Sequence, residues 1–195
     1  MNSFILALVA MTLTSAMSSV SFAGHGKKEI PTVQGVDLNS YVGLWYEIRR
    51  IENEFQDNEP AQGEGVCYNV TAEYSFLPKG KIGVKNTCNR NSGAFVAKAK
   101  AQAVKGSNNA KLKVNFTGIP FLEWLGVGNG DYWVLALGEK NADNQYSWVL
   151  VGSPTLEYGW ILSRTPELPE SEIHTALAIA ESVGYDAHLF KSFQR

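Results

Sequence analysis

The sequence has few of the side chains that carry out chemistry, with three histidines and two cysteines among 195 residues. His25, His174 and His188 lie on an N-terminal leader, a predicted helix and a C-terminal tail, so none falls on the inward face of a predicted strand. Their spacing fits no metal site, and a Ser/His/Asp site would lack the nucleophile elbow. We therefore expect no metal, no cofactor and no catalytic residue, and we do not expect an enzyme.

A large excess of charge of either sign is also absent. The 17 lysines and arginines nearly balance 19 aspartates and glutamates, which gives a formal net charge of −2. Phosphate binding needs a clustered basic excess, and no basic stripe is apparent along the chain. These features argue against a nucleic-acid partner, and an ordinary content of 45% hydrophobic residues indicates one soluble globular domain.

The apolar run from Phe4 to Leu13 is too short to span a bilayer. Ser21 and Ala23 place small residues three and one before a cleavage site at Gly24, as in secretory signal peptides. We interpret residues 1–23 as a signal peptide, 24–34 as a flexible leader and 35–195 as the folded domain. Because the first residues contain no lysine or arginine, a disordered or membrane-anchoring tail is the alternative. No cysteine follows the cleavage position, so we expect an exported protein, periplasmic or secreted, without an N-terminal lipid anchor.

The two cysteines are Cys67 and Cys88. In an exported protein an even pair suggests a disulfide, with two free buried thiols as the alternative. Strict alternation along the predicted strands points Cys88 inward and Cys67 outward. A disulfide between them therefore requires a β-bulge, or a strand that ends before Cys88.

Short strand-like segments with turn signals between them fill the chain beyond residue 35, and a helical pattern appears only near the end. This spacing predicts an all-β fold, either an antiparallel barrel or a sandwich. The eight strands that we count favour an eight-stranded antiparallel up-and-down barrel. In Pro169–Val183, the apolar residues Ile173, Ala176, Leu177 and Ala180 follow helical spacing. We expect this helix to cover the outside of the last three strands, which are apolar on both faces. The predicted strands are 44–51, 66–76, 82–89, 95–104, 111–117, 131–138, 146–152 and 158–164.

The segment from Phe95 to Val104 has alanines on one face and polar residues on the other. Protein interiors are densely packed, so an inward row of alanines leaves space unless large side chains opposite fill it. An eight-stranded barrel is about the size that holds one small ligand. The row therefore favours an internal cavity, the alternative being that Tyr68, Tyr74 and Phe116 fill the space. The inward residues are Ala97, Ala99, Ala101 and Ala103, against Lys98, Lys100 and Gln102 outside.

One end of a small barrel has to be filled. Gly43 and Trp45 open the first predicted strand, and Arg164 closes the last. A large indole can fill the barrel end, and a guanidinium stacked on the ring can shield it. We assign these three residues to structure, in a cup that is closed at one end and open at the other. We interpret the polar segment Glu52–Gly65 as a lid over the open end, with an ordinary surface loop as the alternative.

Three segments resemble the conserved regions of the lipocalin family. The first conserved region resembles Gly43–Glu47. The second resembles Gly130–Leu137, although the family's following Thr-Asp-Tyr turn is absent here. The third resembles Tyr158–Pro166, which includes the family's arginine. The likeness is greatest to the bacterial lipocalin and apolipoprotein D-like subgroup, over residues 33–193. The resemblance implies a lipocalin calyx that transports or stores small hydrophobic ligands. In this subgroup it implies fatty acids or lysophospholipids, in cell-envelope maintenance or stress.

Inward side chains of the predicted strands would line such a calyx, with core packing as the alternative role of each. We expect an acyl lipid as the partner, with its polar head at the open end, and a monomer or weak dimer. The apolar segment Phe121–Leu125 either folds inward or makes a peripheral contact with a membrane surface or a second copy. The candidate ligand-binding residues are Tyr68, Tyr74, Asn86, Ala99, Phe116, Tyr132 and Trp148.

Two other functions compete with a soluble carrier. One lipocalin branch is enzymatic through a cavity cysteine, so a thiol-dependent isomerase that uses Cys88 is the alternative from another class. A transmembrane barrel would turn lysines such as Lys98 and Lys111 toward lipid, at a high cost near the middle of the bilayer.

Overall fold

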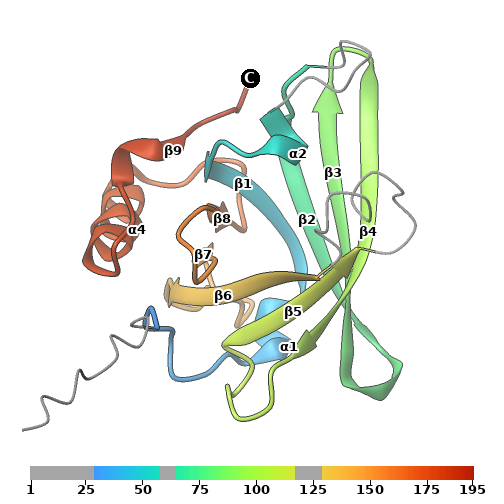
Figure 1. Cartoon of the computed structure of the whole chain (residues 1–195), viewed down its shortest axis with the longest axis vertical. Coiled ribbons are helices and arrows are strands. Elements are labelled where there is room, and N and C mark those ends of the chain that lie inside the picture. The colour runs from blue at the N-terminus through green and yellow to red at the C-terminus, as the bar shows by residue number, and fades with distance from the viewer. Residues whose placement is uncertain (1–28, 58–64, 117–128) are drawn as a thin grey trace, which may run out of the picture.

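The computed structural model describes residues 29–57, 65–116 and 129–195 (Figure 1). The expected signal peptide, part of the leader, part of the lid segment and the apolar segment Phe121–Leu125 lie outside the described residues. Within the described ranges, no helix has the length and apolar character needed to cross a membrane. The same ranges hold no group of three or more His, Cys, Asp or Glu side chains placed to bind a metal ion.

Eight antiparallel strands form a closed barrel, as the sequence predicts. Strands β2 to β8 pair in chain order, and β1 closes the barrel because it pairs with both β8 and β2. The short strand β9 (Phe190–Lys191) adds to the end of β1. The barrel strands are β1 (Gly43–Ile51), β2 (Tyr68–Leu77), β3 (Lys81–Arg90), β4 (Gly93–Ala103), β5 (Lys111–Phe116), β6 (Asn129–Leu137), β7 (Trp148–Gly152) and β8 (Gly159–Ser163).

Short helices mark the two ends of the barrel, and a long one covers its side (Figure 1). Helix α1 (Leu38–Tyr41) lies at the end closed by Trp45, and α2 (Glu54–Asp57) lies at the other end. Helix α4 (Glu170–Ser182) confirms the helix predicted near the C-terminus. Its buried residues Ile173, Ala176 and Ala180 pack on the outer face of the barrel.

The barrel has two apolar clusters, one inside the wall and one between the wall and α4. On β7, Val149 and Val151 belong to the inner cluster, whereas Trp148 and Leu150 belong to the outer one. This division explains why the last three barrel strands are apolar on both faces: each face is covered, by the interior or by the helix.

At the closed end, Trp45 is fully buried and its Nε1 donates a hydrogen bond to the Tyr41 carbonyl at 2.8 Å. The Arg164 guanidinium lies 3.8 Å from the centre of a Trp45 ring. Burial lowers the pKa of Arg164 to about 10, so the side chain remains a cation at neutral pH. It donates to the carbonyl oxygens of Ser40, Tyr41, Val42, Leu44 and Tyr146.

Glycine is required at position 43. Its φ of +107° lies in a region that other residues rarely adopt, and a Cβ there would lie 3.2 Å from Arg164 Nη1. The start of β1 can therefore approach the guanidinium only without a side chain.

Cys67 and Cys88 form a disulfide, and the β-bulge that it requires is present. The β2–β3 register shifts between Tyr68 and Thr71, and Asn69 at the shift has a φ of +45°. The extra residue reverses the alternation on its N-terminal side. Cys67 therefore packs with Cys88 and Val70 in one small buried cluster.

The expectation that the chain carries no basic stripe was wrong. Strands β3, β4 and β5 contain six lysines and no acidic residue, and they are neighbours in the sheet. Each strand contributes lysines only at alternate positions, so the stripe is not visible along the chain. The sheet assembles it from three separate segments.

We predict that Arg164→Ala lowers the free energy of unfolding by about 2 kcal/mol or more, because five carbonyl oxygens each lose a hydrogen bond from the guanidinium and the indole loses its cover. Chemical denaturation measures the loss. Arg164→Lys is the control, because it keeps the charge but cannot span the same carbonyls. An unchanged Arg164→Ala denaturation curve would contradict the role of this residue.

We predict that replacing both cysteines, Cys67→Ser with Cys88→Ser, lowers the free energy of unfolding by about 3 kcal/mol, as expected for a closed loop of about 20 residues. Thermal denaturation of the oxidised protein and the double variant measures the difference. Thiol titration of the unfolded, unreduced protein should detect no free thiol, and two thiols per chain would refute the disulfide.

Candidate functional site

Small side chains line the inner face of the barrel at β2, β3 and β4. Asn86 on β3 lies opposite Ala72 on β2 and Ala97 on β4. The next inward residue of β4, Ala99, lies between Val84 and Phe116 in the register. At the level of Asn86, this part of the wall therefore consists of two alanines and one asparagine, without the large residues that usually fill a barrel of this size.

Several inward residues elsewhere in the barrel keep part of their surface exposed. Phe116, Tyr132 and Trp160 pack against the inner cluster but remain only partly buried. Ala97 is also partly exposed although it is an inward residue of β4. The inward face therefore keeps some solvent-accessible surface at Ala97, Phe116, Tyr132 and Trp160.

Asn86 brings an unsatisfied polar atom to this wall. Its Oδ1 is buried and has no hydrogen-bond partner among the described residues. An unpaired buried amide oxygen is unfavourable by roughly 1–3 kcal/mol.

Three tyrosine hydroxyl groups meet deeper in the barrel, next to the closed end. The Tyr41 and Tyr132 hydroxyl oxygens lie 2.6 Å apart, and the Tyr74 hydroxyl donates to that of Tyr132 at 3.0 Å. The two hydrogen bonds use two of the three hydroxyl hydrogens. One hydroxyl group is therefore left to donate to a further acceptor.

Burial keeps these phenols neutral. It raises the pKa of Tyr74 to about 12 and the pKa values of Tyr41 and Tyr132 well above their usual range. The cluster therefore offers hydrogen-bond donors and no charge at physiological pH. A neutral oxygen of a ligand, such as a carbonyl or hydroxyl, suits it better than a carboxylate does, because no cation is part of the cluster.

The open end is tied together by a buried ionic network. The fully buried Arg50 guanidinium pairs with Glu47 on the same strand and with Asp57 on α2, and it donates to the Cys67 carbonyl. Gln56 Nε2 donates to Glu47 at 2.8 Å. Burial raises the pKa of Glu47, and the contacts with Arg50 and Gln56 oppose that rise.

Aromatic rings continue the contact between α2 and the barrel. Phe55 stacks on Tyr158, whose ring is parallel to that of Trp160 at 6.2 Å between centroids. Trp160 Nε1 donates to the Gln56 side chain at 3.0 Å. The described part of the predicted lid segment is thus held at the open end, and its role as a lid remains a prediction.

The structure brings together most of the candidate ligand-binding residues. Tyr74, Ala99, Phe116 and Tyr132 pack in or against the inner cluster, and Asn86 lies between Ala72 and Ala97 on the same face.

The prediction that Tyr68 lines the interior is wrong. Its ring lies under the Arg195 guanidinium of the C-terminal tail at 4.4 Å, and its hydroxyl donates to the Arg90 carbonyl. None of these contacts is with the inner cluster. The bulge that allows the disulfide also moves Tyr68 off the face on which simple alternation places it.

The prediction that Trp148 lines the interior is also wrong. It packs in the outer cluster, where it borders a shallow cleft with Glu172 and Thr175 of α4. Because β7 is apolar on both faces, alternation alone could not decide which face is inward. Trp148 supports the helix contact and does not line the interior.

Several residues of the interior and the open end are not among those predicted from the sequence pattern. Tyr41 lies in a short helix that precedes the first predicted strand, so no strand pattern places it. Trp160 could have been identified, because it alternates with the inward Leu162. The contacts of Glu47 and Gln56 depend on the position of α2, for which the sequence has no periodic signal.

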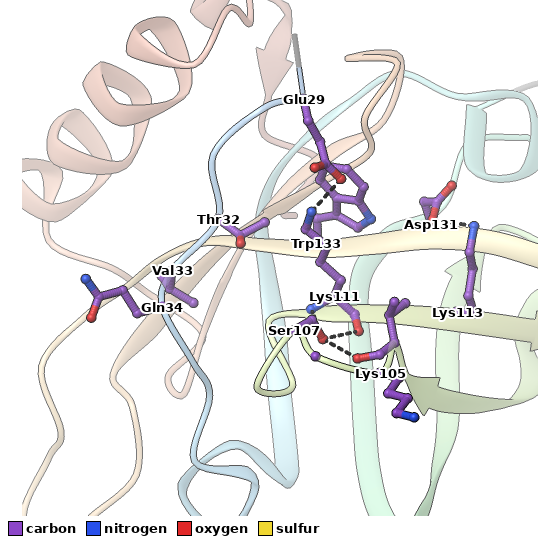
Figure 2. A pocket seen from close by; sticks show the side chains of 12 residues that line it. Glu29, Thr32, Val33, Gln34, Lys105, Ser107, Lys111, Lys113, Asp131 and Trp133 are labelled. Carbon is purple, nitrogen blue, oxygen red and sulfur yellow. Dashed lines mark hydrogen bonds and ion pairs between the residues drawn. The ribbon is translucent and has the colours of Figure 1, made fainter. Parts of the chain in front are cut away.

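A surface groove of about 600 Å³ lies outside the barrel between the N-terminal segment and β5–β6 (Figure 2). Figure 2 shows Lys111 beside Glu29 and Trp133, and Lys113 beside Asp131. The Lys111–Glu29 pair holds the N-terminal segment on the wall, whereas the Lys113–Asp131 pair joins β5 to β6. The groove is therefore a structural junction, and the candidate site is the barrel interior.

Comparison with known proteins agrees with this geometry. The family described as a Lipocalin-like domain matches residues 36–195. The chain is 37% identical to Temperature-induced lipocalin-1 of Arabidopsis thaliana, over 82% of this chain and 80% of that one. It is 31% identical to the Outer membrane lipoprotein Blc of Escherichia coli (strain K12), over 95% and 94% of the two chains.

Other similarities extend to animal proteins. The chain is 30% identical to Apolipoprotein D of Macaca fascicularis, over 85% of this chain and 84% of that one. Among solved structures, insecticyanin from Manduca sexta aligns with a TM-score of 0.62 at 20% identity, over 85% and 84% of the two chains, which is a likeness of fold. With a family match that spans most of its length, the chain belongs to the lipocalin family.

Proposed function

We propose that this lipocalin binds and carries small hydrophobic ligands with acyl chains, such as fatty acids or lysophospholipids, inside its barrel. The observation that supports the proposal is the run of small inward residues on β2–β4, where Ala72, Asn86 and Ala97 are opposite one another and Ala99 is the next inward residue. Small hydrophobic ligands are also what lipocalins bind as a family, which supports the same proposal.

The energetics suit a carrier that tolerates different chains. Burying a chain of about 16 carbons gains at most about 12 kcal/mol, at roughly 0.8 kcal/mol per CH₂ group. Association costs about 4–15 kcal/mol in lost translational and rotational freedom. The difference is compatible with reversible binding, and the tyrosine hydroxyl groups and Asn86 can add selectivity for ligands with polar atoms along the chain.

The isomerase alternative requires a thiol. The chain has two cysteines, and both are in the disulfide between Cys67 and Cys88. Neither sulfur can act as a nucleophile while this bond is intact. The disulfide therefore favours the carrier, and it also fits our proposal that the protein works outside the cytoplasm, in the periplasm or as a secreted protein.

We predict that Ala97→Phe weakens the binding of palmitate and lysophosphatidylcholine at least tenfold, because the new ring would occupy the space beside Asn86. Isothermal titration calorimetry measures the affinity. Gln102→Phe is the matched control, because it adds the same ring to an exposed, outward position of the same strand.

The control variant should bind both ligands as the wild type does. If Ala97→Phe binds them with unchanged affinity while remaining folded, the ligand does not occupy the barrel interior. Native mass spectrometry of the wild type with extracted lipids should also detect a bound acyl lipid.

A further inference from the structure

Charge is divided very unequally along this chain, although its total is nearly balanced. Residues 74–122 contain nine lysines and arginines and no aspartate or glutamate. All 19 acidic residues and the other eight cationic residues lie outside that segment. The segment contains β3, β4 and β5, so one side of the barrel is strongly basic within a protein that is acidic elsewhere.

The exposed lysines of these strands form a continuous surface. We call Lys85, Lys98, Lys100 and Lys113 the lysine wall; all four are exposed, and they lie on the outer face of three neighbouring strands. Helix α4, whose exposed or partly exposed acidic residues include Glu170 and Glu181, covers a different side of the barrel (Figure 1).

The positions of these lysines lower the stability of the sheet. Lys85 on β3 and Lys98 on β4 are directly opposite in the register, and like charges at such positions destabilise a sheet. Lys98 and Lys100 have no carboxylate partner within the described residues. Lys85 has Glu73 at 3.3 Å, but both side chains are about half exposed (50% and 53%), so this pair contributes little. Lys113 pairs with Asp131 at 2.6 Å. The charges of Lys98 and Lys100 are therefore the ones without compensation among the described residues, and an anionic partner would compensate them.

The end of the wall at the barrel mouth carries exposed apolar side chains. Phe95 and Val96 at the start of β4 are 45% and 43% exposed. They lie at the α2 end of the barrel, since Arg90 at the preceding turn donates to the carbonyl of Phe55 in α2. Val96 shares the outward face of β4 with Lys98 and Lys100. Phe95 has the parity of the inward Ala97 and lies at the rim of the barrel.

We propose that the lysine wall, together with Phe95 and Val96, docks on an anionic lipid bilayer. Lysines at a bilayer surface are attracted by acidic headgroups, and adjacent apolar side chains enter the boundary between headgroups and acyl chains. A soluble polyanion would use the lysines alone, so the exposed apolar pair favours the bilayer. This geometry would bring the open end of the barrel next to the membrane. The proposed docking does not depend on which ligand the barrel binds.

Vesicle co-sedimentation tests the proposal with the full-length folded protein and two kinds of vesicle, phosphatidylcholine alone and phosphatidylcholine with phosphatidylglycerol. The wild type should bind the anionic vesicles and release them as salt screens the attraction. Lys98→Gln with Lys100→Gln should weaken this binding about 30-fold, at roughly fivefold for each lysine. Val96→Ser should weaken it further without changing its dependence on salt.

The matched control is Ala142→Glu with Ala178→Glu, which makes the same change in net charge at exposed positions outside the wall. The control should bind almost as the wild type does, and the lysine variant should bind palmitate in solution with unchanged affinity. The proposal would be overturned if the wild type bound both kinds of vesicle equally, or if the two double variants weakened binding equally. Binding to soluble heparin without binding to anionic vesicles would also overturn it.

Discussion

The stack of Arg164 on Trp45 is the interaction on which the rest of this barrel depends. An eight-stranded barrel with small residues on part of its inner wall cannot be stabilised by a filled core along its whole length. The closed end has to supply more of the stability, and it does so with a fully buried indole, a guanidinium and five carbonyl oxygens. Rigidity at this end permits an open interior at the other.

One strand shows how the two faces of the same wall serve different purposes. On its inward face β4 presents alanines, which we propose leave room for a ligand. On its outward face it presents Lys98 and Lys100, which have no carboxylate partner among the described residues. The inward alanines and the outward lysines both lower the stability of the isolated barrel. Both become favourable when a lipid lies inside the barrel and an acidic surface lies against its outer face. A carrier that collects its ligand from a membrane would need both features together.

Much of this architecture could be predicted from the sequence because it follows from alternation, helical periodicity and side-chain size. All eight barrel strands, the C-terminal helix, the Trp45–Arg164 plug and the bulge required by a disulfide are confirmed. The errors arose where alternation fails. A single extra residue in β2 displaced Tyr68, and a strand that is apolar on both faces left Trp148 undecided. The network around Arg50 and the basic wall join segments that are distant in the sequence, and their contacts follow only from the closed sheet.

The central claim is that an acyl chain occupies the barrel interior beside the alanine wall. A crystal structure of the protein with 16-bromohexadecanoic acid tests it most directly, because bromine can be located by its anomalous scattering. We expect a bromine peak inside the barrel, within the space bounded by Ala97, Phe116 and Tyr132. An interior filled by the protein's own side chains, with bromine only on the outer surface, would contradict the account.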